Sequence, residues 1–332
     1  MKNWILNIEL LQRMKKIAVI DTGINLEYRE FKGKNIEIVD IKRRKIYKDI
    51  NGHGTSCCGE ILKYNPMASL VIIPILDENC ICNLEELYNA LLYCNDREDI
   101  GIINLSMSCN IDDYEIIELF ESLINEIYKK GKILVVSNKN KVTDVEKIYP
   151  YNYKNVLSVT KSSQIYPYII FDNKNNRCQV SNDFYFMPSM NQKYRIFYGN
   201  SSLTAKMTGL LSSEINKLKE KESSISKVVY LCNKRLQYIF KIENEIYSNI
   251  KQEEIQMVKD RLNKIWSVFR DKRDKILKQD IELERKYYSD NGGEFLQSVE
   301  KELGFQIDLR EFTIEDLKSL NLLVEKCLYY GL

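Results

Sequence analysis

A single histidine, His53, stands in a setting that suits acid–base chemistry. It lies between Gly52 and Gly54, just ahead of a segment, Cys57 to Tyr64, that we expect to be helical. Glycine on both sides allows a sharp turn and a close approach of other backbone groups. Histidine is the side chain that titrates nearest to neutral pH, which makes it the commonest general base. The alternative interpretation is a chance histidine in a glycine-rich turn.

Two further stretches carry groups that can work with an imidazole. Asp21 follows the apolar run from Lys16 to Ile20, which we read as a buried parallel strand that delivers a carboxylate at its carboxyl end. Ser201 follows Gly199 at the start of a predicted helix, where the helix dipole and free N–H groups favour a developing negative charge. Taken singly, Asp21 can be a loop residue and Ser201 a helix cap. Together the three groups suit nucleophilic catalysis by a serine.

The elements that must position these residues alternate between strand and helix. Apolar runs predict strands over 16–20, 36–41, 70–76, 100–105, 132–136 and 156–159. Amphipathic patterns predict helices over 84–93 and 111–130. This alternation indicates an α/β fold with a parallel sheet, right-handed crossovers and helices on both faces. Between 172 and 197 the chain is aromatic and we expect it to be irregular.

These motifs, found together, resemble the subtilisin-like serine peptidases. The order of Asp, His and Ser along the chain is that of subtilisin. The matching segments are Asp21-Thr22-Gly23, His53-Gly54-Thr55, Tyr149-Pro150, Phe186-Met187-Pro188 and Gly199 to Gly209. The resemblance covers about residues 16–212 and implies the subtilisin-like parallel sheet with helices on both faces.

The resemblance also implies catalytic roles. Ser201 attacks the peptide carbonyl, His53 takes its proton and passes it to the leaving amine, and Asp21 fixes the imidazole tautomer. The family supplies an asparagine that stabilises the oxyanion beside the backbone N–H of the nucleophile. Counting along the predicted strand favours Asn140 for this role, with Asn138 as the alternative.

The strand that ends near residue 105 resembles the family's substrate-binding edge strand. The substrate-binding residues implied there are Ser106, Met107 and Ser108. The segment before Ala68 is too short for the calcium-binding loop of some relatives, so we expect no metal and no cofactor. No pro-domain precedes Lys16, so we also expect folding without an intramolecular chaperone.

Departures from the family pattern surround the nucleophile. The usual Gly-Thr-Ser-Met-Ala is Gly-Asn-Ser-Ser-Leu in this chain, which places Ser202 beside Ser201. Counting back from Gly209 assigns the nucleophile to Ser201. Lys139 stands where the family has glycine. We read the adjacent Cys57-Cys58 as packing residues of the helix after His53.

The composition excludes several classes of partner. The net charge of +2 predicts no strong attraction to nucleic acid or to an anionic membrane. No run approaches the roughly 20 apolar residues of a membrane span, and the first residues lack the features of a secretory signal. The nine cysteines have no metal-ligand spacing and fit reduced thiols. We therefore expect a soluble, cytoplasmic protein.

The last third of the chain is rich in Lys and Glu, and we predict two domains. The first is a subtilisin-like peptidase domain over 16–225, and the second is a helical appendage over 226–332. Apolar residues recur there at helical spacing and form one stripe: Ile255, Val258, Leu262, Ile265, Trp266 and Phe269. The stripe packs among the helices or on the peptidase domain, or it docks a protein partner. If the appendage serves only to dock a partner, we expect a truncated chain that ends near Lys227 to keep its catalytic geometry.

From about residue 255 the appendage resembles a shortened, degenerate carrier-protein domain. Gly292-Gly293 precede a predicted helix that ends at Leu303-Gly304, as in acyl and peptidyl carrier domains. The modified serine expected just after the glycines is absent, and Phe295 stands near its position. A docking module without a cofactor site is the implied role.

These features predict a serine endopeptidase that uses Asp21, His53 and Ser201 on a peptide or protein substrate. Intracellular maturation of a peptide product, such as leader removal, suits a small peptidase beside a carrier-like tail. The alternative is a catalytically impaired subtilisin-fold protein that acts as a binding scaffold.

Overall fold

The structure is a computed structural model that describes residues 4–41, 48–139, 148–163, 168–181, 184–191, 193–247, 252–276 and 281–331. Its contacts divide the chain into two compact units. The first unit comprises residues 1–182 and 198–237, and the second comprises residues 183–197 and 238–332. This division differs from the one expected from composition, because a short segment from the middle of the chain belongs with the C-terminal helices.

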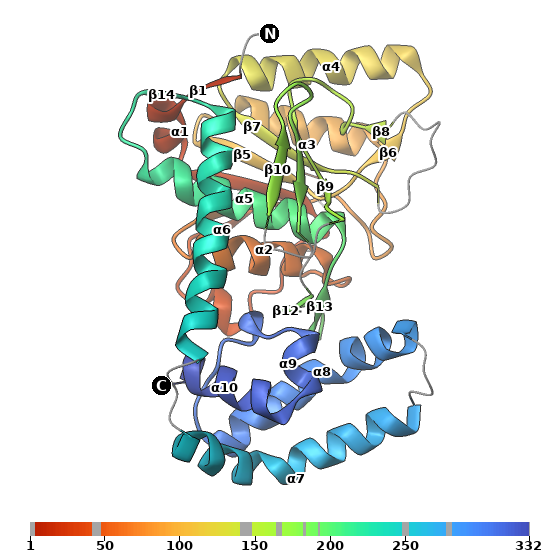
Figure 1. The fold of residues 1–332 in the computed structure, drawn as a ribbon. Coiled ribbons are helices and arrows are strands. Elements are labelled where there is room, and N and C mark those ends of the chain that lie inside the picture. Colours follow the sequence, from red (N-terminus) through yellow and green to blue (C-terminus); the bar gives the residue numbers. More distant parts are fainter. Residues whose placement is uncertain are drawn as a thin grey trace. The chain divides into compact units, whose positions relative to one another are not determined.

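An eight-stranded sheet forms the centre of the first unit, in the order β10-β11-β9-β7-β5-β2-β4-β3 (Figure 1). The strands are β2 (Lys16–Asp21), β3 (Ile36–Ile38), β4 (Ser69–Pro74), β5 (Ile100–Leu105), β7 (Ile133–Ser137), β9 (Leu157–Lys161), β10 (Ile169–Asp172) and β11 (Arg177–Val180). Among the strands that the structure describes in this sheet, only the β10–β11 pair is antiparallel. The predicted parallel α/β fold is confirmed, and the six predicted strands are present with boundaries shifted by at most three residues.

Helices cover both faces of this sheet (Figure 1). On one face α2 (His53–Tyr64) packs closely against α5 (Asn200–Lys217). A Cβ on Gly209 would lie 2.7 Å from the Ile61 carbonyl oxygen, so the crossing of these helices requires glycine there. On the other face α3 (Leu84–Asp96) and α4 (Tyr114–Lys129) bury their apolar sides against β2, β4, β5 and β7. Because the central strands are buried on both faces, they appear in the sequence as continuous apolar runs.

Smaller elements complete the first unit. They are β1 (Ile5–Asn7), α1 (Ile8–Met14), the 3-10 helix η1 (Arg29–Phe31), β6 (Cys109–Asn110), β8 (Ile148–Tyr149), β14 (Glu222–Ser224) and the first part of α6 (Ile225–Tyr247). β1 pairs with β14 and β6 pairs with β8, both antiparallel. Across the described ranges, no helix is long and apolar enough to cross a membrane.

The expectation that residues 172–197 are irregular is wrong. This stretch contains β11 and an antiparallel hairpin of β12 (Tyr185–Pro188) and β13 (Tyr194–Phe197). β11 extends the main sheet by pairing with β9. These strands have only four residues each and depend on partners distant in sequence. Local periodicity therefore gives little sign of them.

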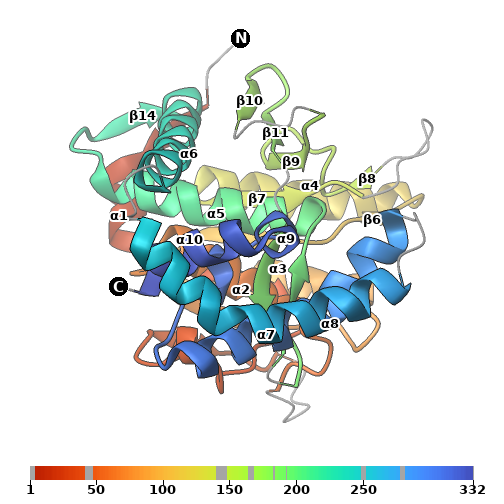
Figure 2. The same ribbon diagram turned by 60° about the horizontal axis from the view of Figure 1, so that its bottom comes forward.

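The second unit joins that hairpin to the C-terminal helices, of which Figure 2 labels α7, α8, α9 and α10. Its remaining elements are α7 (Gln252–Ile276), α8 (Ile281–Leu303), the 3-10 helix η2 (Leu309–Glu311), α9 (Ile314–Lys318) and α10 (Leu320–Gly331). The predicted apolar stripe lies on α7, which packs against α8 and α10. Within it, Phe269 stacks on Phe295 with ring centroids 4.1 Å apart. Four of the six stripe residues are buried, so most of the stripe is used in packing among the helices.

The β12–β13 hairpin packs against α8 at two glycines in the middle of that helix, Gly292 and Gly293. A Cβ on Gly293 would lie 2.0 Å from the Tyr194 carbonyl oxygen, and one on Gly292 would lie 2.5 Å from the Phe186 ring. The Phe186 N–H also donates to the Phe312 carbonyl oxygen at 3.0 Å. α8 runs continuously through both glycines, so they do not precede a helix as the carrier-like interpretation required. The carrier resemblance is not supported, and close packing explains the glycines.

Candidate active site

Asp21 and His53 are in direct contact at the carboxyl edge of the sheet. Asp21 is the last residue of β2, and its carboxylate is fully buried. His53 is the first residue of α2, and its Nδ1 lies 2.7 Å from Asp21 Oδ1. A carboxylate only accepts hydrogen bonds, so Nδ1 carries the proton and Nε2 is the basic nitrogen of the neutral ring.

Two glycines bring these residues together. Gly23 has φ +121°, a backbone conformation that side chains disfavour. A Cβ on Gly54 would lie 2.3 Å from the Gly23 carbonyl oxygen. The Gly54 N–H donates to Thr22 Oγ1 at 2.9 Å, which joins the start of α2 to the end of β2. The motifs Asp-Thr-Gly and His-Gly-Thr thus form one interlocked contact.

Asp49 shapes the turn that presents His53. Its buried carboxylate accepts hydrogen bonds from Gly52 N at 2.7 Å, Thr55 N at 2.9 Å and Thr55 Oγ1 at 2.6 Å. These groups belong to the turn and the first residues of α2, where backbone N–H groups lack helical partners. Sequence analysis did not single out Asp49. An acidic residue shortly before a predicted helix start was the available signal.

The surroundings of His53 raise its pKa above the ordinary value of 6.5. Burial by itself lowers the pKa, because it disfavours the imidazolium. The charge of Asp21, the hydrogen bond to Asp21 and the charge of Asp49 act in the opposite direction and together outweigh burial. The site therefore stabilises a protonated imidazole, as proton transfer from a nucleophile requires.

Cys57 touches the same carboxylate. Its Sγ lies 3.5 Å from Asp21 Oδ2 and 3.9 Å from His53 Nδ1. Burial and the charge of Asp21 raise the pKa of this thiol well above its usual value, so it remains a neutral S–H donor. In the described ranges, Asp21, His53 and Cys57 form the one cluster of potential metal ligands, with atoms within 4.8 Å of one another. The hydrogen bonds among them account for this arrangement.

Ser201 lies in the first turn of α5, as predicted, and is half-buried. Its Oγ donates to the Ser106 carbonyl oxygen at 2.9 Å, and Ser106 Oγ donates to the Ser201 carbonyl oxygen at 3.2 Å. The neighbouring Ser202 is only 3% exposed. This difference in exposure supports Ser201 over Ser202 as the nucleophile.

The other predicted site residues lie at the ends of β5 and β7. Ser106 directly follows β5 and is buried, whereas Met107 and Ser108 are half-buried. Asn138 follows β7, and its Oδ1 accepts a hydrogen bond from the Lys139 N–H at 2.8 Å. Asn140, the favoured oxyanion donor, lies outside the described residues.

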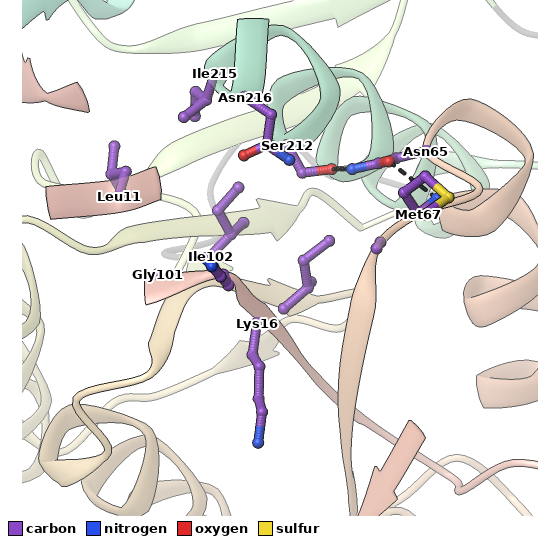
Figure 3. Close-up of a pocket in the computed structure, with 12 residues that line it drawn as sticks. Leu11, Lys16, Asn65, Met67, Gly101, Ile102, Ser212, Ile215 and Asn216 are labelled. Atoms are coloured by element: carbon purple, nitrogen blue, oxygen red, sulfur yellow. Dashed lines mark hydrogen bonds between the residues drawn. The ribbon is translucent and has the colours of Figure 1, made fainter. Parts of the chain in front are cut away.

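A cavity of about 40 Å³ opens at the opposite edge of the sheet (Figure 3). Lys16, Gly101 and Ser212 are among the residues that line it, and Asn65 Nδ2 donates to Ser212 Oγ at 2.9 Å. Lys16 begins β2 and Asp21 ends it, and five residue steps of a strand span about 16 Å. The cavity is therefore separate from the site at Asp21.

Known proteins match the part of the chain that carries these residues. Residues 13–224 match the subtilase family. A thermophilic serine proteinase of Bacillus sp. (strain AK1) is 28% identical over 158 residues, which are 44% of this chain and 37% of that protein. An intracellular serine protease of Paenibacillus polymyxa is 25% identical over 216 residues, which are 59% of this chain and 65% of that protein.

A solved structure adds a likeness in fold. The crystal structure of a lanthipeptide protease matches with a TM-score of 0.53 and 17% identity, over 68% of this chain and 79% of that one. The chain spans less than two thirds of the length of both relatives named above. The family match covers more than half of the chain and contains Asp21, His53 and Ser201. We conclude that this chain belongs to the subtilase family.

Proposed function

We propose that this protein is a serine endopeptidase that hydrolyses peptide bonds with Asp21, His53 and Ser201. The observation that carries the proposal is the contact of the half-buried His53 with the buried Asp21, at 2.7 Å, in a chain of the subtilase family. An imidazole held by a carboxylate is the general base that a serine hydroxyl needs in order to become a nucleophile.

The proposed reaction begins when Ser201 Oγ turns from the Ser106 carbonyl and donates its hydrogen bond to His53 Nε2. Oγ attacks the substrate carbonyl, and its proton moves to Nε2. The resulting imidazolium is stabilised by Asp21 and Asp49, the groups that raise the His53 pKa. Nε2 then gives the proton to the leaving amine. Water next attacks the acyl-enzyme and gives a proton to Nε2, which passes it to Ser201 Oγ as the carboxylic acid product leaves.

The oxyanion that forms in this reaction needs fixed donors. One is the backbone N–H of Ser201 at the start of α5, where helix N–H groups lack intrahelical partners. The side-chain donor in the proposal is Asn140, with Asn138 as the alternative. Ser106, Met107 and Ser108 are the proposed contacts for the substrate backbone.

Maturation of a peptide product inside the cell, such as leader removal, is the proposed setting. A lanthipeptide protease shares the fold, which supports a peptide substrate. All nine cysteines are free thiols, as suits a reducing compartment. Four residues of the apolar stripe, Ile255, Val258, Leu262 and Phe269, are buried, which leaves only part of the stripe for docking a protein partner.

Labelling with a fluorophosphonate, followed by mapping of the labelled residue, tests the proposed function. We expect Ser201 to carry the label and Ser201→Ala to abolish it. Ser202→Ala is the matched control and should retain most of the labelling, because its hydroxyl is buried. A folded wild-type protein that takes no label would favour the binding-scaffold alternative instead.

A further inference from the structure

Asn200, the residue before the proposed nucleophile, makes three hydrogen bonds to two strand ends. Its Oδ1 accepts from the Lys161 N–H at 2.8 Å. Its Nδ2 donates to the Asn138 carbonyl oxygen at 3.1 Å and to the Lys139 carbonyl oxygen at 2.9 Å. The residue is only 5% exposed. Both amide hydrogens are therefore used on the backbone that follows β7.

The strands joined in this way are neighbours in the sheet. β9 ends at Lys161, and the backbone of Asn138 and Lys139 continues directly from β7, which pairs with β9. The Asn138 N–H already donates to the Val159 carbonyl oxygen at 2.9 Å, so the two strand ends are held to each other. Asn200 adds the start of α5 to this assembly. One side chain thus fixes three chain segments beside Ser201.

The next residue is Ser201, the proposed nucleophile, so the hydrogen bonds of Asn200 are relevant to catalysis. Asn138, one of the two candidate oxyanion donors, belongs to the segment that Asn200 holds. An oxyanion donor is effective only if it is fixed within a few tenths of an ångström of the forming negative charge. Because Asn200 and Ser201 share a peptide bond, any shift of the segment relative to Asn200 is also a shift relative to the nucleophile.

We propose that Asn200 is a positioning residue that holds Asn138 and Lys139, directly after β7, in register with Ser201, so that the oxyanion donor on this segment meets the developing charge. The inference rests on the proposed peptidase function. It assigns the role to the side-chain amide, because only a group with two N–H donors and an oxygen acceptor makes all three contacts. The threonine that the family usually has at this position carries a single hydroxyl.

Saturation kinetics of fluorophosphonate labelling separate this role from a purely structural one. The Ser201 oxygen forms a bond to phosphorus, fluoride leaves, and the proton goes to His53. The constant KI reports reversible binding of the probe, and kinact reports the covalent step, in which charge develops on the phosphoryl oxygen. A positioning role predicts a lower kinact with unchanged KI, whereas general disruption of the site changes both.

The decisive variant is Asn200→Asp, which keeps the size and the acceptor but removes both N–H donors. We expect kinact to fall about 10²-fold, the effect of misplacing a catalytic group by about 1 Å. Asn200→Thr keeps one donor and should give an intermediate kinact. It also decides the question if Asn200→Asp does not yield soluble protein.

Ser212→Ala is the matched control. Ser212 lies on the same helix, is buried and bonds to Asn65 and Gly209, so its loss removes buried hydrogen bonds without touching the segment after β7. Its kinact should equal that of the wild type. The inference is overturned if the soluble Asn200 variants have the wild-type kinact. It is also overturned if their probe binding, measured as KI, weakens as much as kinact falls. An unlabelled wild-type protein overturns the proposed function and the inference with it, so the two failures are distinguishable.

Discussion

At the scale of single residues, His53 is the proposed general base, so its pKa sets the pH range of the proposed reaction. A general base must be unprotonated, and the charges of Asp21 and Asp49 outweigh burial in raising its pKa above 6.5. The rate of fluorophosphonate labelling should therefore rise with pH, and its midpoint should lie above 6.5. A pH profile of kinact/KI in the wild-type protein measures this midpoint. A midpoint at or below pH 6.5 would contradict the prediction.

The identity of the oxyanion donor is a second question at this scale. Asn140→Ala should lower turnover by about 10²–10³-fold with little change in KM, because the lost hydrogen bond forms only as charge develops. Asn138→Ala should have a milder effect. Peptide hydrolysis by the two variants, measured as kcat and KM, gives the ranking. The opposite order would transfer the role to Asn138.

Residues proposed to perform chemistry were easier to predict from the sequence than residues that hold them in place. Asp21, His53 and Ser201 stand in short motifs, and the structure brings Asp21 and His53 into contact. Asp49 and Asn200 act through hydrogen bonds to backbone groups, and Asn200 reaches strand ends about 40 and 60 residues away in sequence. No local pattern marks such contacts, because their partners are defined only by the fold.

At the scale of elements, the packing of α8 against the β12–β13 hairpin depends on Gly293. Gly293→Ala should destabilise the second unit by about 1–3 kcal/mol, because the new methyl group would overlap the Tyr194 backbone. Denaturant unfolding followed by circular dichroism measures the change. Ser298→Ala, at an exposed position of the same helix, is the control and should change stability by no more than about 0.5 kcal/mol. Equal stability of the two variants would show that the hairpin does not pack as described.

Some elements can be predicted from the local sequence, whereas others form only by pairing with strands that are distant in sequence. The central strands were predictable because burial on both faces requires continuous apolar runs, such as Ile133–Ser137. The four-residue strands β11, β12 and β13 were missed because their pairing is non-local. The helical stripe of α7 was recognised, but periodicity alone does not say which surface it covers. The structure shows that α8 and α10 cover it.

At the scale of the whole molecule, the second unit contains chain from both sides of α5. A chain that ends after Gln237 lacks α8, against which the fully buried Phe186 ring packs. Exposing a side chain of this kind costs about 1.5–3 kcal/mol. We therefore expect this truncation to be insoluble or to label poorly with fluorophosphonate, in contrast to the expectation from sequence for a chain that ends near Lys227.

Expression of the truncated and full-length chains, followed by melting curves and labelling, tests this prediction. A soluble truncation with a cooperative melt and wild-type labelling would contradict it. Such a result would show that the hairpin is stable without its helices and that the C-terminal region is a separate appendage.

The pairing of the hairpin with distant helices also has a consequence during synthesis on the ribosome. Phe186 donates its N–H to Phe312, 126 positions later. At about 5–20 residues per second, translation needs roughly 6–25 s to make the intervening chain. During that interval the hairpin that leads into α5 lacks the helices on which it packs. A nascent chain thus carries Asp21, His53 and Ser201 well before this part of the fold can close. If the proposed peptidase activity needs the packed hairpin, we expect it to appear only after the C-terminal helices have emerged.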